Sequence, residues 1–312
     1  SSNNLNNQIN FGVIGTGSRG QGLIKLLNEI KGCNIIGVCD NIPFRLDEGF
    51  SLIKNSKKAK AYSDYRKLLD NKNIDAIIVS TPLNTHDQIS IDALDADKHV
   101  YCEKGLTRTF QEAIDVYDTI KETGVVLQLG HQNRQVEAND KAKQIIDKGL
   151  LGPVNLVELT TNRNSPWGAW VWSIHKDANR NTIDWDTFQE PSPNKIPFGE
   201  EALKRYFRWR CWYDYGTGLS GDLFSHDYDQ LNQIMGMGIP KYASSSGGIY
   251  FYKDGRDVPD VWHATLEYPD KDLTVLYSAT LSSNSSRGNR IMGHDATMVL
   301  GGMSNAGSVG GF

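Results

Sequence analysis

The sequence has no long apolar run, and no stretch approaches the roughly 18 consecutive apolar residues that a membrane-spanning helix needs. It also has no strong net charge: 33 basic and 37 acidic side chains leave −4 over 312 residues. This balance gives no reason to expect nucleic acid or an anionic membrane as a partner. What remains is a globular chain that is long enough for two domains and a sizeable core.

Cysteine is scarce, with only Cys33, Cys39, Cys102 and Cys211. None stands in a C-x-x-C pair or at another metal-ligand spacing, so we expect reduced thiols and no bound metal. Reduced thiols slightly favour a cytoplasmic protein. The polar N-terminal spacer 1–8, which has neither an initiator Met nor a signal peptide, also suits an exported or periplasmic protein, so both compartments stay open.

The clearest motif lies in the first forty residues. A strand-type run at 9–14 ends in Gly15-Thr16-Gly17-Ser18-Arg19-Gly20, which leads into helical periodicity, and a second strand-type run ends in Asp40. This order of strand, G-x-G-x-x-G turn, helix, strand and acid is typical of a dinucleotide site. The alternative is an α/β domain whose glycine turn binds nothing.

Each part of that motif has a physical role. Gly15 permits the tight turn, Gly17 lets backbone N–H groups approach a pyrophosphate, and Gly20 lets the helix pack closely on the strand. The helix N-terminus faces the phosphate charge. Asp40 is expected to accept hydrogen bonds from the adenosine ribose and to repel a 2′-phosphate, which favours NAD over NADP.

Strand-type and helix-type segments continue to alternate beyond Asp40, which predicts a doubly wound parallel sheet. We expect strands at 75–80, 98–102 and 125–130, and helices at about 85–97 and 109–123. Ligands of such sheets bind beyond the carboxyl ends of the strands, where the loops 81–86 and 103–107 lie.

The pattern changes after residue 130. A helix at roughly 136–149 is followed by strand-type runs at 154–161, 249–252, 261–268 and 273–281, several of which alternate apolar and polar residues. These runs predict an α+β domain with a large, mainly antiparallel sheet. We therefore expect a dinucleotide-binding domain at 1–130 and a substrate-binding and oligomerisation domain at 131–312. The Gly-rich tail 301–312 is expected to be loop or disordered.

Two further groups of residues carry candidate chemistry. Glu103 and Lys104 directly follow a predicted strand, where a lysine ammonium could polarise a substrate oxygen; an ordinary surface pair is the alternative. Asp222, His226 and Asp229 follow a glycine loop at spacings that place them on one helical face. Such a His can act as a general base, bind a metal with the carboxylates, or be a buried structural residue.

Residues 163–215 are rich in aromatic side chains, with six of the seven tryptophans and three interleaved arginines. Each ring by itself is more often core than binding site. For the cluster we favour carbohydrate binding, since Trp and Tyr faces stack on sugar C–H faces. A single-stranded nucleic-acid groove is disfavoured by the acidity of the chain. The candidate substrate-binding residues are Arg163, Trp167, Trp209, Tyr213 and Asp229.

Together these motifs resemble the Gfo/Idh/MocA oxidoreductase family, which includes glucose–fructose oxidoreductase and inositol dehydrogenase. The resemblance covers nearly the whole chain: GTGSRG with Asp40, TPLNTH at 81–86, DADKHVYCEKG at 95–105, GHQNR at 130–134, KGLLGPV at 148–154 and GDLFSHDYD at 221–229. It implies an N-terminal Rossmann doubly wound parallel sheet, a C-terminal α+β domain, NAD as the cofactor, a carbohydrate substrate, and a homodimer or homotetramer.

The resemblance also implies residue roles. Lys104, Asp222 and His226 match the family's catalytic residues, and Asp229 matches its second carboxylate after the His. The chain departs from the family at Gly105, where a proline usually fixes the backbone that aims the lysine. The candidate cofactor-binding residues are Gly15, Gly17, Ser18, Arg19, Gly20, Asp40, Thr81, Pro82, Asn84, His86, Glu103 and Lys104.

The implied activity is NAD-dependent oxidation of a secondary hydroxyl of a sugar, cyclitol or glycoside. His226 would take the proton, Asp222 would orient His226, and Lys104 would stabilise the oxyanion. The alternative is a glycosidase that keeps its NAD while it oxidises a sugar, eliminates the aglycone and reduces the ring again. A non-catalytic cofactor-binding protein is a third interpretation. The chain also stops short of the closing strand and helix common in relatives, which indicates either truncation or last segments that are joined across a gap.

Overall fold

The computed structural model describes residues 8–300, which form two compact units. The first unit comprises the chain up to Gly130 together with Ile174–Trp209, and the second comprises His131–Ser173 and the chain from Arg210 onward. The sequence-based division at residue 130 differs at one place, because it assigns 174–209 to the second domain. Those residues cluster instead with the dinucleotide-binding unit. The Gly-rich tail 301–312 and residues 1–7 of the spacer lie outside the described residues.

The first unit is built on a sheet with the strand order β3-β2-β1-β4-β5-β6, in which every neighbouring pair is parallel. This is the order of a doubly wound dinucleotide-binding fold, as the sequence predicts. The strands are β1 (Ile9–Ile14), β2 (Cys33–Cys39), β3 (Lys60–Tyr62), β4 (Ala76–Val79), β5 (His99–Glu103) and β6 (Leu127–Gly130).

Helices cover both faces of this sheet, because alternate strand residues feed two separate cores. Val13 and Ile78 pack with Ile24 of α1, whereas Ile14 and Ile77 belong to the core that includes residues of α3 and α4. The helices are α1 (Ser18–Leu27), α2 (Pro43–Ser51), α3 (Tyr65–Leu69), α4 (His86–Asp95) and α5 (Phe110–Thr123).

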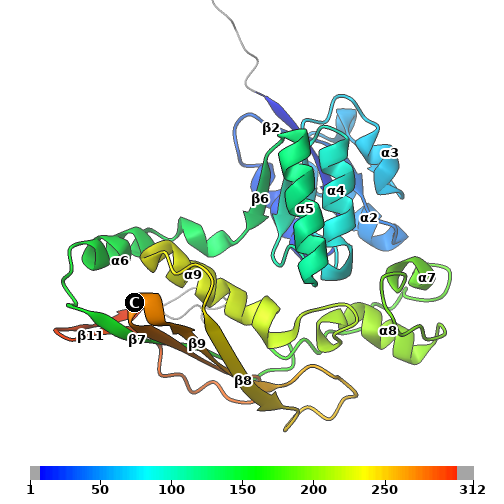
Figure 1. The fold of residues 1–312 in the computed structure, drawn as a ribbon. Coiled ribbons are helices and arrows are strands. Elements are labelled where there is room, and N and C mark those ends of the chain that lie inside the picture. Colours follow the sequence, from blue (N-terminus) through cyan, green and yellow to red (C-terminus); the bar gives the residue numbers. More distant parts are fainter. Residues whose placement is uncertain (1–7, 301–312) are drawn as a thin grey trace, which may run out of the picture. The chain divides into compact units, whose positions relative to one another are not determined.

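The second unit has a mixed sheet in the order β12-β11-β7-β10-β9-β8, in which only β7 and β10 pair in parallel. Helices α6 and α9 pack together on one face of it (Figure 1). The sheet is therefore mainly antiparallel, which confirms the α+β prediction. Its elements are α6 (Glu137–Asp147), β7 (Val154–Asn162), α9 (Ser225–Met235), β8 (Tyr242–Gly248), β9 (Val261–Tyr268), β10 (Leu273–Thr280), β11 (Asn289–Gly293) and β12 (Thr297–Leu300).

One strand prediction is wrong. The aromatic run 249–252 is a turn, because the backbone N–H groups of Tyr250, Phe251 and Tyr252 donate to the buried carboxylate of Asp260 at 2.9, 2.8 and 2.6 Å. The strand lies just before it, at β8, whose side chains are mostly exposed. Its Ser- and Gly-rich sequence lacks the apolar alternation that marks a strand.

Residues 174–209 form a small folded segment of the first unit. It contains α7 (Trp185–Phe188) and α8 (Glu200–Phe207), and Trp185, Phe188 and Phe207 are buried. The short helical turns within residues 8–300 are η1 (Ser56–Lys58), η2 (Leu83–Thr85), η3 (Gln132–Gln135), η4 (Trp209–Cys211), η5 (Ser220–Phe224) and η6 (Pro269–Lys271).

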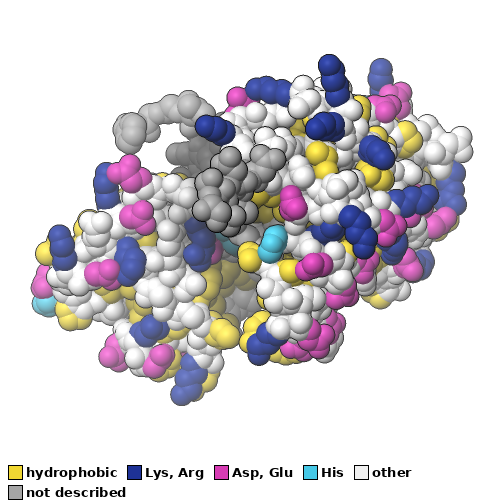
Figure 2. All heavy atoms as spheres, turned by 90° about the horizontal axis from the view of Figure 1, so that it is seen from above, with side chains coloured by type: hydrophobic (Ala, Val, Ile, Leu, Met, Phe, Trp, Pro, Cys, Tyr) yellow, Lys and Arg dark blue, Asp and Glu magenta, His cyan; other side chains and the backbone are white. Residues whose placement is uncertain are grey.

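The surface agrees with the balanced charge of the sequence. On the face seen in Figure 2, acidic and basic side chains are interspersed. Within residues 8–300, no helix has both the length and the apolar character needed to cross a membrane. The four cysteines all fall in the described part of the chain and form no disulfides, and three of them are buried.

Candidate active site

The glycine turn between β1 and α1 is held by close packing. Gly15 has φ of +88°, and a Cβ on it would lie 2.7 Å from the backbone nitrogen of Thr81. A Cβ on Gly20 would lie 2.0 Å from the carbonyl oxygen of Gly15. Both positions therefore require glycine for the turn itself.

Gly17 differs, because it leaves room for a ligand. A Cβ there would meet only the Arg45 side chain, 3.3 Å away at the nearest nitrogen. Helix α1 starts at the next residue, and no side chain caps its N-terminus. An uncapped helix start beside a bare glycine backbone fits a pyrophosphate, which would accept hydrogen bonds from the first N–H groups of the helix.

Asp40 lies directly after β2 and is half-buried. Its Oδ2 accepts hydrogen bonds from Thr16 N at 2.8 Å and Thr16 Oγ1 at 3.2 Å, and its Oδ1 accepts one from Ile42 N at 3.0 Å. Burial raises the pKa of Asp40, against the lowering effect of these bonds and of Arg45. A carboxylate oxygen can accept two hydrogen bonds, so Oδ1 keeps capacity for a ribose hydroxyl.

Arg45 is a site residue that sequence reasoning missed. The sequence places it on the helix after Asp40, and it does belong to α2, but its guanidinium turns back over Gly17. Thr16 Oγ1 donates to the Arg45 carbonyl oxygen at 2.8 Å, which fixes this turn of the helix. The guanidinium can therefore pair with a pyrophosphate. Its position in the first turn of α2, two residues after Pro43, is the only sequence signal.

His86 joins two loops at the carboxyl ends of β4 and β5. Its Nδ1 lies 2.7 Å from the Gly105 carbonyl oxygen and its Nε2 lies 2.7 Å from the Thr81 carbonyl oxygen. Two carbonyl acceptors need two N–H donors, which only the imidazolium has. Burial alone would lower the pKa of His86, but Cys102 and the two carbonyls outweigh it and raise the pKa to about 9. Both ring nitrogens of His86 are thus hydrogen-bonded to backbone carbonyl oxygens.

Asn84 is buried in the same loop, beside Thr81 and Pro82. Its Nδ2 donates to the Phe188 carbonyl oxygen at 2.8 Å. Its Oδ1 is buried, and no donor among the described residues reaches it. A buried acceptor without a donor indicates a place for a bound molecule.

Glu103 and Lys104 end β5. Glu103 is buried and its Oε1 pairs with Arg19 Nη2 at 2.6 Å, so the pair links the carboxyl end of β5 to the start of α1. Lys104 is half-buried, and its peptide bond to Gly105 is cis. The described residues of the first unit thus bring the predicted cofactor residues to one edge of the sheet.

The second unit holds Asp222, His226 and Asp229 on consecutive helical turns. Asp222 lies in the π-turn η5, which runs directly into α9 with His226 and Asp229. The sequence predicts one regular helix here, whereas the structure inserts a π-turn, a feature often found at functional sites. Among residues 8–300, no group of three or more His, Cys, Asp or Glu side chains could hold a metal ion.

Arginines pair with both carboxylates of this group. Arg210 Nε donates to Asp222 Oδ1 at 3.0 Å, and Arg134 Nε donates to the two oxygens of Asp229 at 2.9 and 3.0 Å. His226 lies edge-on to His131, with ring centroids 5.5 Å apart. Sequence reasoning missed these partners, since they lie far from α9 in the chain.

Asp227, the next residue after His226, has a different role. It is buried, accepts hydrogen bonds from Thr161 Oγ1 and Asn289 Nδ2, and so ties α9 to β7 and β11. Burial raises its pKa to about 6, although both hydrogen bonds oppose the shift. Asp227 thereby fixes the helix that carries His226.

The aromatic segment divides into core and surface. Trp170, Trp185 and Trp212 are buried, whereas Trp167 and Tyr213 expose 61% and 51% of their surface. The structure therefore leaves the last two rings available for stacking. Of the other candidate substrate-binding residues, Arg163 and Asp229 lie in the second unit and Trp209 lies in the first.

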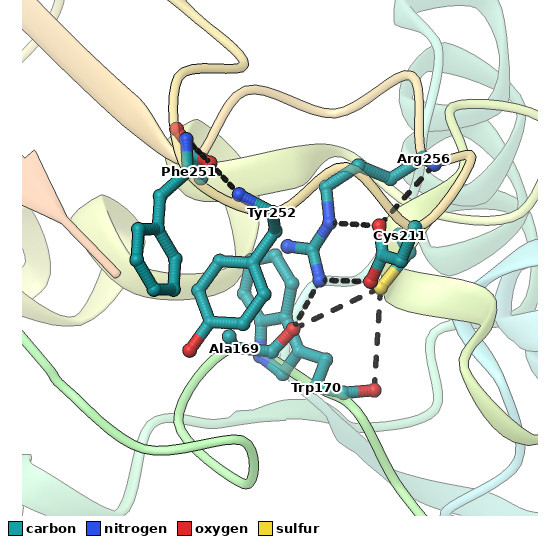
Figure 3. A network of polar contacts seen from close by, with 8 residues as sticks. Ala169, Trp170, Cys211, Phe251, Tyr252 and Arg256 are labelled. Atoms are coloured by element: carbon teal, nitrogen blue, oxygen red, sulfur yellow. Dashed lines mark hydrogen bonds and ion pairs between the residues drawn. The ribbon is translucent and has the colours of Figure 1, made fainter. Parts of the chain in front are cut away.

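A buried polar network holds the loop that carries Trp167 (Figure 3). Arg256 Nη2 donates to the Ala169 carbonyl oxygen at 2.9 Å, and the same guanidinium pairs with Asp254 at 2.8 Å through both Nε and Nη2. The Cys211 thiol lies 3.8 Å from the Ala169 carbonyl oxygen. Trp170 adopts φ of +64° in this loop. The network thus fixes the backbone next to the exposed Trp167.

Comparison with known proteins tests this assignment. Residues 9–131 match the model of the GFO_IDH_MocA group, the oxidoreductase family with an NAD-binding Rossmann fold. The matched stretch is the Rossmann part of the first unit, which thus resembles the family's NAD-binding domain. This confirms the resemblance seen in the motifs and NAD as the cofactor of the domain.

Individual relatives extend the comparison. Inositol 2-dehydrogenase of Salmonella typhimurium is 31% identical over 143 residues, which are 45% of this chain and 42% of that protein. The 2,7-anhydro-N-acetylneuraminate hydratase of Escherichia coli is 29% identical over 273 residues, which are 86% of this chain and 61% of that protein. The chain therefore spans about half the length of these Gfo/Idh/MocA relatives.

A solved structure shows that the likeness of fold covers both units. The WlbA dehydrogenase from Bordetella pertussis, crystallised with NADH and UDP-GlcNAcA, has a TM-score of 0.71 at 19% identity. The match covers 93% of this chain and 78% of that one. The likeness of fold thus extends over the second sheet as well.

Proposed function

We propose that this chain is an NAD-dependent oxidoreductase that acts on a secondary hydroxyl of a sugar, cyclitol or glycoside. The observation that carries the proposal is the set of groups suited to a dinucleotide at the glycine turn. These are Gly17, which leaves space beside the backbone, the uncapped start of α1, and Asp40, which can accept a further hydrogen bond. The relative named inositol 2-dehydrogenase supports a polyhydroxylated substrate.

The proposed chemistry divides between the residues of the two units. When bound, NAD supplies the acceptor for the hydride that leaves the substrate carbon. His226 takes the hydroxyl proton, and Asp222, itself paired with Arg210, orients the imidazole. Lys104 donates a hydrogen bond to the oxygen as negative charge develops on it, which stabilises the transition state. A ketone, NADH and a protonated His226 result.

Exposed and half-buried side chains of the second unit are the proposed substrate contacts. The rings of Trp167 and Tyr213 present faces on which a sugar can stack. The guanidinium of Arg163 and the Arg134–Asp229 pair offer donors and acceptors for hydroxyl groups. His86 and Asn84 shape the nicotinamide-side loop and bring Thr81 and Pro82 to the cofactor.

A second candidate is a redox-neutral reaction, in which the enzyme keeps its NAD and returns the hydride to the product. Glycoside cleavage by transient oxidation and elimination is the form that the sequence suggests. A relative named as a hydratase aligns with 86% of this chain, and that observation favours this candidate.

The two candidates differ in their products. The wild-type chain is incubated with NAD and a panel of inositols, free sugars and aryl glycosides. Stoichiometric NADH from a free polyol supports the dehydrogenase, whereas release of the aglycone without net NADH supports the redox-neutral reaction. In either case Lys104→Met and His226→Gln should lower turnover by about 10²–10⁴-fold. The matched controls are Lys72→Met and His294→Gln, which alter exposed side chains. Unchanged turnover in the first two variants would indicate a non-catalytic role.

A further inference from the structure

Residues 174–209 interrupt the second unit in sequence but fold against the first. Three separate contacts attach this segment to the Rossmann unit. Two of them lie on helix α2, which follows β2, and the third lies in the loop that follows β4. Strands β2 and β4 flank β1 on either side, so the segment contacts the chain on both sides of the glycine turn.

The first contact lies on α2, directly after Asp40. The rings of Phe44 and His175 stack with centroids 4.1 Å apart and an interplanar angle of 9°. His175 Nε2 also lies 3.8 Å from Glu48 Oε1 on the same helix. The start of the segment is thus fixed on the helix that follows the ribose-binding acid.

The second contact comes from the other end of the segment. The Arg45 guanidinium lies 6.0 Å from the centre of the Phe207 ring, within the range of a cation–π interaction. Burial, together with the negative charge of Asp40, raises the pKa of the neighbouring Tyr206. The end of α8 therefore lies in the electrostatic field of the Asp40–Arg45 pair.

The third contact reaches the loop after β4. It is the buried hydrogen bond from Asn84 Nδ2 to the Phe188 carbonyl oxygen at the end of α7. An open hollow lies where the segment meets the residues after Asp40, and it is lined by Asn41, Pro43 and residues 180–186.

The segment has enough internal structure to act as one body. Trp185 is almost completely buried, and its Nε1 donates to the Ile196 carbonyl oxygen at 2.9 Å. Gln189 Oε1 accepts a hydrogen bond from Ile196 N at 3.0 Å, and Phe188 packs on Tyr206 with ring centroids 4.7 Å apart. The stretches before and after the loop 190–199 are thereby joined.

We propose that residues 174–209 form a clasp over the adenosine half of NAD, which lines the hollow beside Asp40 and slows release of the cofactor. The inference rests on the proposed NAD site. In a Rossmann unit the adenosine lies at the β2 side of the glycine turn, where Asp40 takes the ribose. A segment attached on both sides of that crevice must open before the cofactor leaves, so dissociation becomes slow. Slow release suits an enzyme that reuses its NAD.

ADP-ribose, which is NAD without nicotinamide, isolates this half of the site. We expect His175→Ala and Phe207→Leu to weaken ADP-ribose binding and to speed NADH release by about five-fold, the value of one aromatic contact. The affinity ratio of NADH to ADP-ribose should stay constant, because the nicotinamide side is untouched. Glu200→Gln is the control, since that exposed side chain pairs only with Lys204 of its own helix within the described residues.

Limited proteolysis tests the clasp independently. Lys195 is an exposed residue of the segment 174–209, and ADP-ribose should slow trypsin cleavage at Lys195 in the wild-type chain. Equal NADH release from the wild type, His175→Ala and Phe207→Leu, or cleavage at Lys195 that ADP-ribose leaves unchanged, would overturn the clasp while leaving the NAD site intact. A wild-type chain that binds no ADP-ribose would overturn the NAD site as well.

Discussion

At the scale of single residues, Asp40 and Arg45 place opposite charges at the adenosine end of the cofactor site. In the proposed site Asp40 offers an acceptor for the ribose, and Arg45 lies over Gly17, the proposed position of the pyrophosphate. The carboxylate repels a 2′-phosphate, whereas the guanidinium attracts phosphate of either kind. Cofactor choice therefore depends on the balance between these two side chains.

That balance predicts a preference for NAD. NAD should bind at least about ten-fold tighter than NADP, because the Asp40 charge opposes a 2′-phosphate. In Asp40→Ser the preference should disappear or reverse, since Arg45 then acts unopposed. Fluorescence titrations with the two reduced cofactors measure both dissociation constants. The control is Asp47→Ser, which alters an exposed acid on α2, the helix that carries Arg45. Equal affinities in the wild type would mean that Asp40 does not reach the ribose.

His86 predicts a pH dependence of stability. Its pKa rises from 6.5 to about 9 on folding, so its contribution is complete below 6.5 and is lost as the pH rises through 9. The full contribution is about 3 kcal/mol. Urea unfolding below and above this window should show the loss in the wild type. His86→Leu should be less stable at low pH and lack this step, whereas the exposed-site variant His99→Gln should keep it. A flat wild-type profile would show that His86 is neutral.

Predictability from sequence differs among these residues for a physical reason. The glycine turn and Asp40 are local, because strand, turn and acid follow one another along the chain. Arg134 pairs with Asp229 of α9, and Arg210 pairs with Asp222 of η5, each from another segment of the chain, and no local pattern predicts such a pairing. The role of His86 as a link between two carbonyls likewise depends on the fold, so the sequence shows only that it stands in the right loop.

At the scale of elements, the Trp167 loop depends on one buried ion pair. Burial alone would raise the pKa of Asp254, but the Arg256 guanidinium holds it below its usual range. Arg256→Met leaves Asp254 and the Ala169 carbonyl oxygen without their donor. The free energy of unfolding should fall by about 3 kcal/mol.

The matched control for this pair is Lys143→Met. Lys143 pairs with Asp147 on the exposed face of α6, and loss of that pair should cost less than about 1 kcal/mol. Chemical denaturation of both variants gives the comparison. Equal losses in the two would show that Arg256 is not part of a buried network.

Helices and strands also differ in how well the sequence predicts them. Strands β1, β2 and β4 of the parallel sheet are short apolar runs, and β4 is buried at every position. The three-residue strand β3 is mostly exposed, and the sequence does not predict it. Strand β8 is exposed and rich in Ser and Gly, so its place comes from pairing with β9 and not from its own composition. The π-turn before α9 has no separate sequence signal, because it differs from an α-helix only in hydrogen bonding.

At the scale of the whole molecule, alternation of strands and helices predicts the Rossmann unit, and the later β-rich runs predict the mainly antiparallel sheet. The division into consecutive domains fails at 174–209. That segment joins the first unit through Phe44, Arg45 and Asn84, contacts between residues more than one hundred positions apart. Sequence periodicity carries no information on such distant contacts.

Assembly remains a prediction at this scale. Helices α6 and α9 pack on one face of the second sheet, and a sheet covered on one side offers its other face to a partner. We expect a homodimer or homotetramer. Light scattering at micromolar concentration measures the mass, and a monomer there would contradict this expectation.

The central claim is that the glycine turn and Asp40 bind NAD, and a calorimetric titration of the wild-type chain with NADH tests it most directly. The account predicts saturable binding of one NADH per chain, weakened in Gly17→Val, whose side chain would fill the space left for the pyrophosphate. Absence of binding by the folded wild-type chain at millimolar NADH, or equal binding by Gly17→Val, would contradict it.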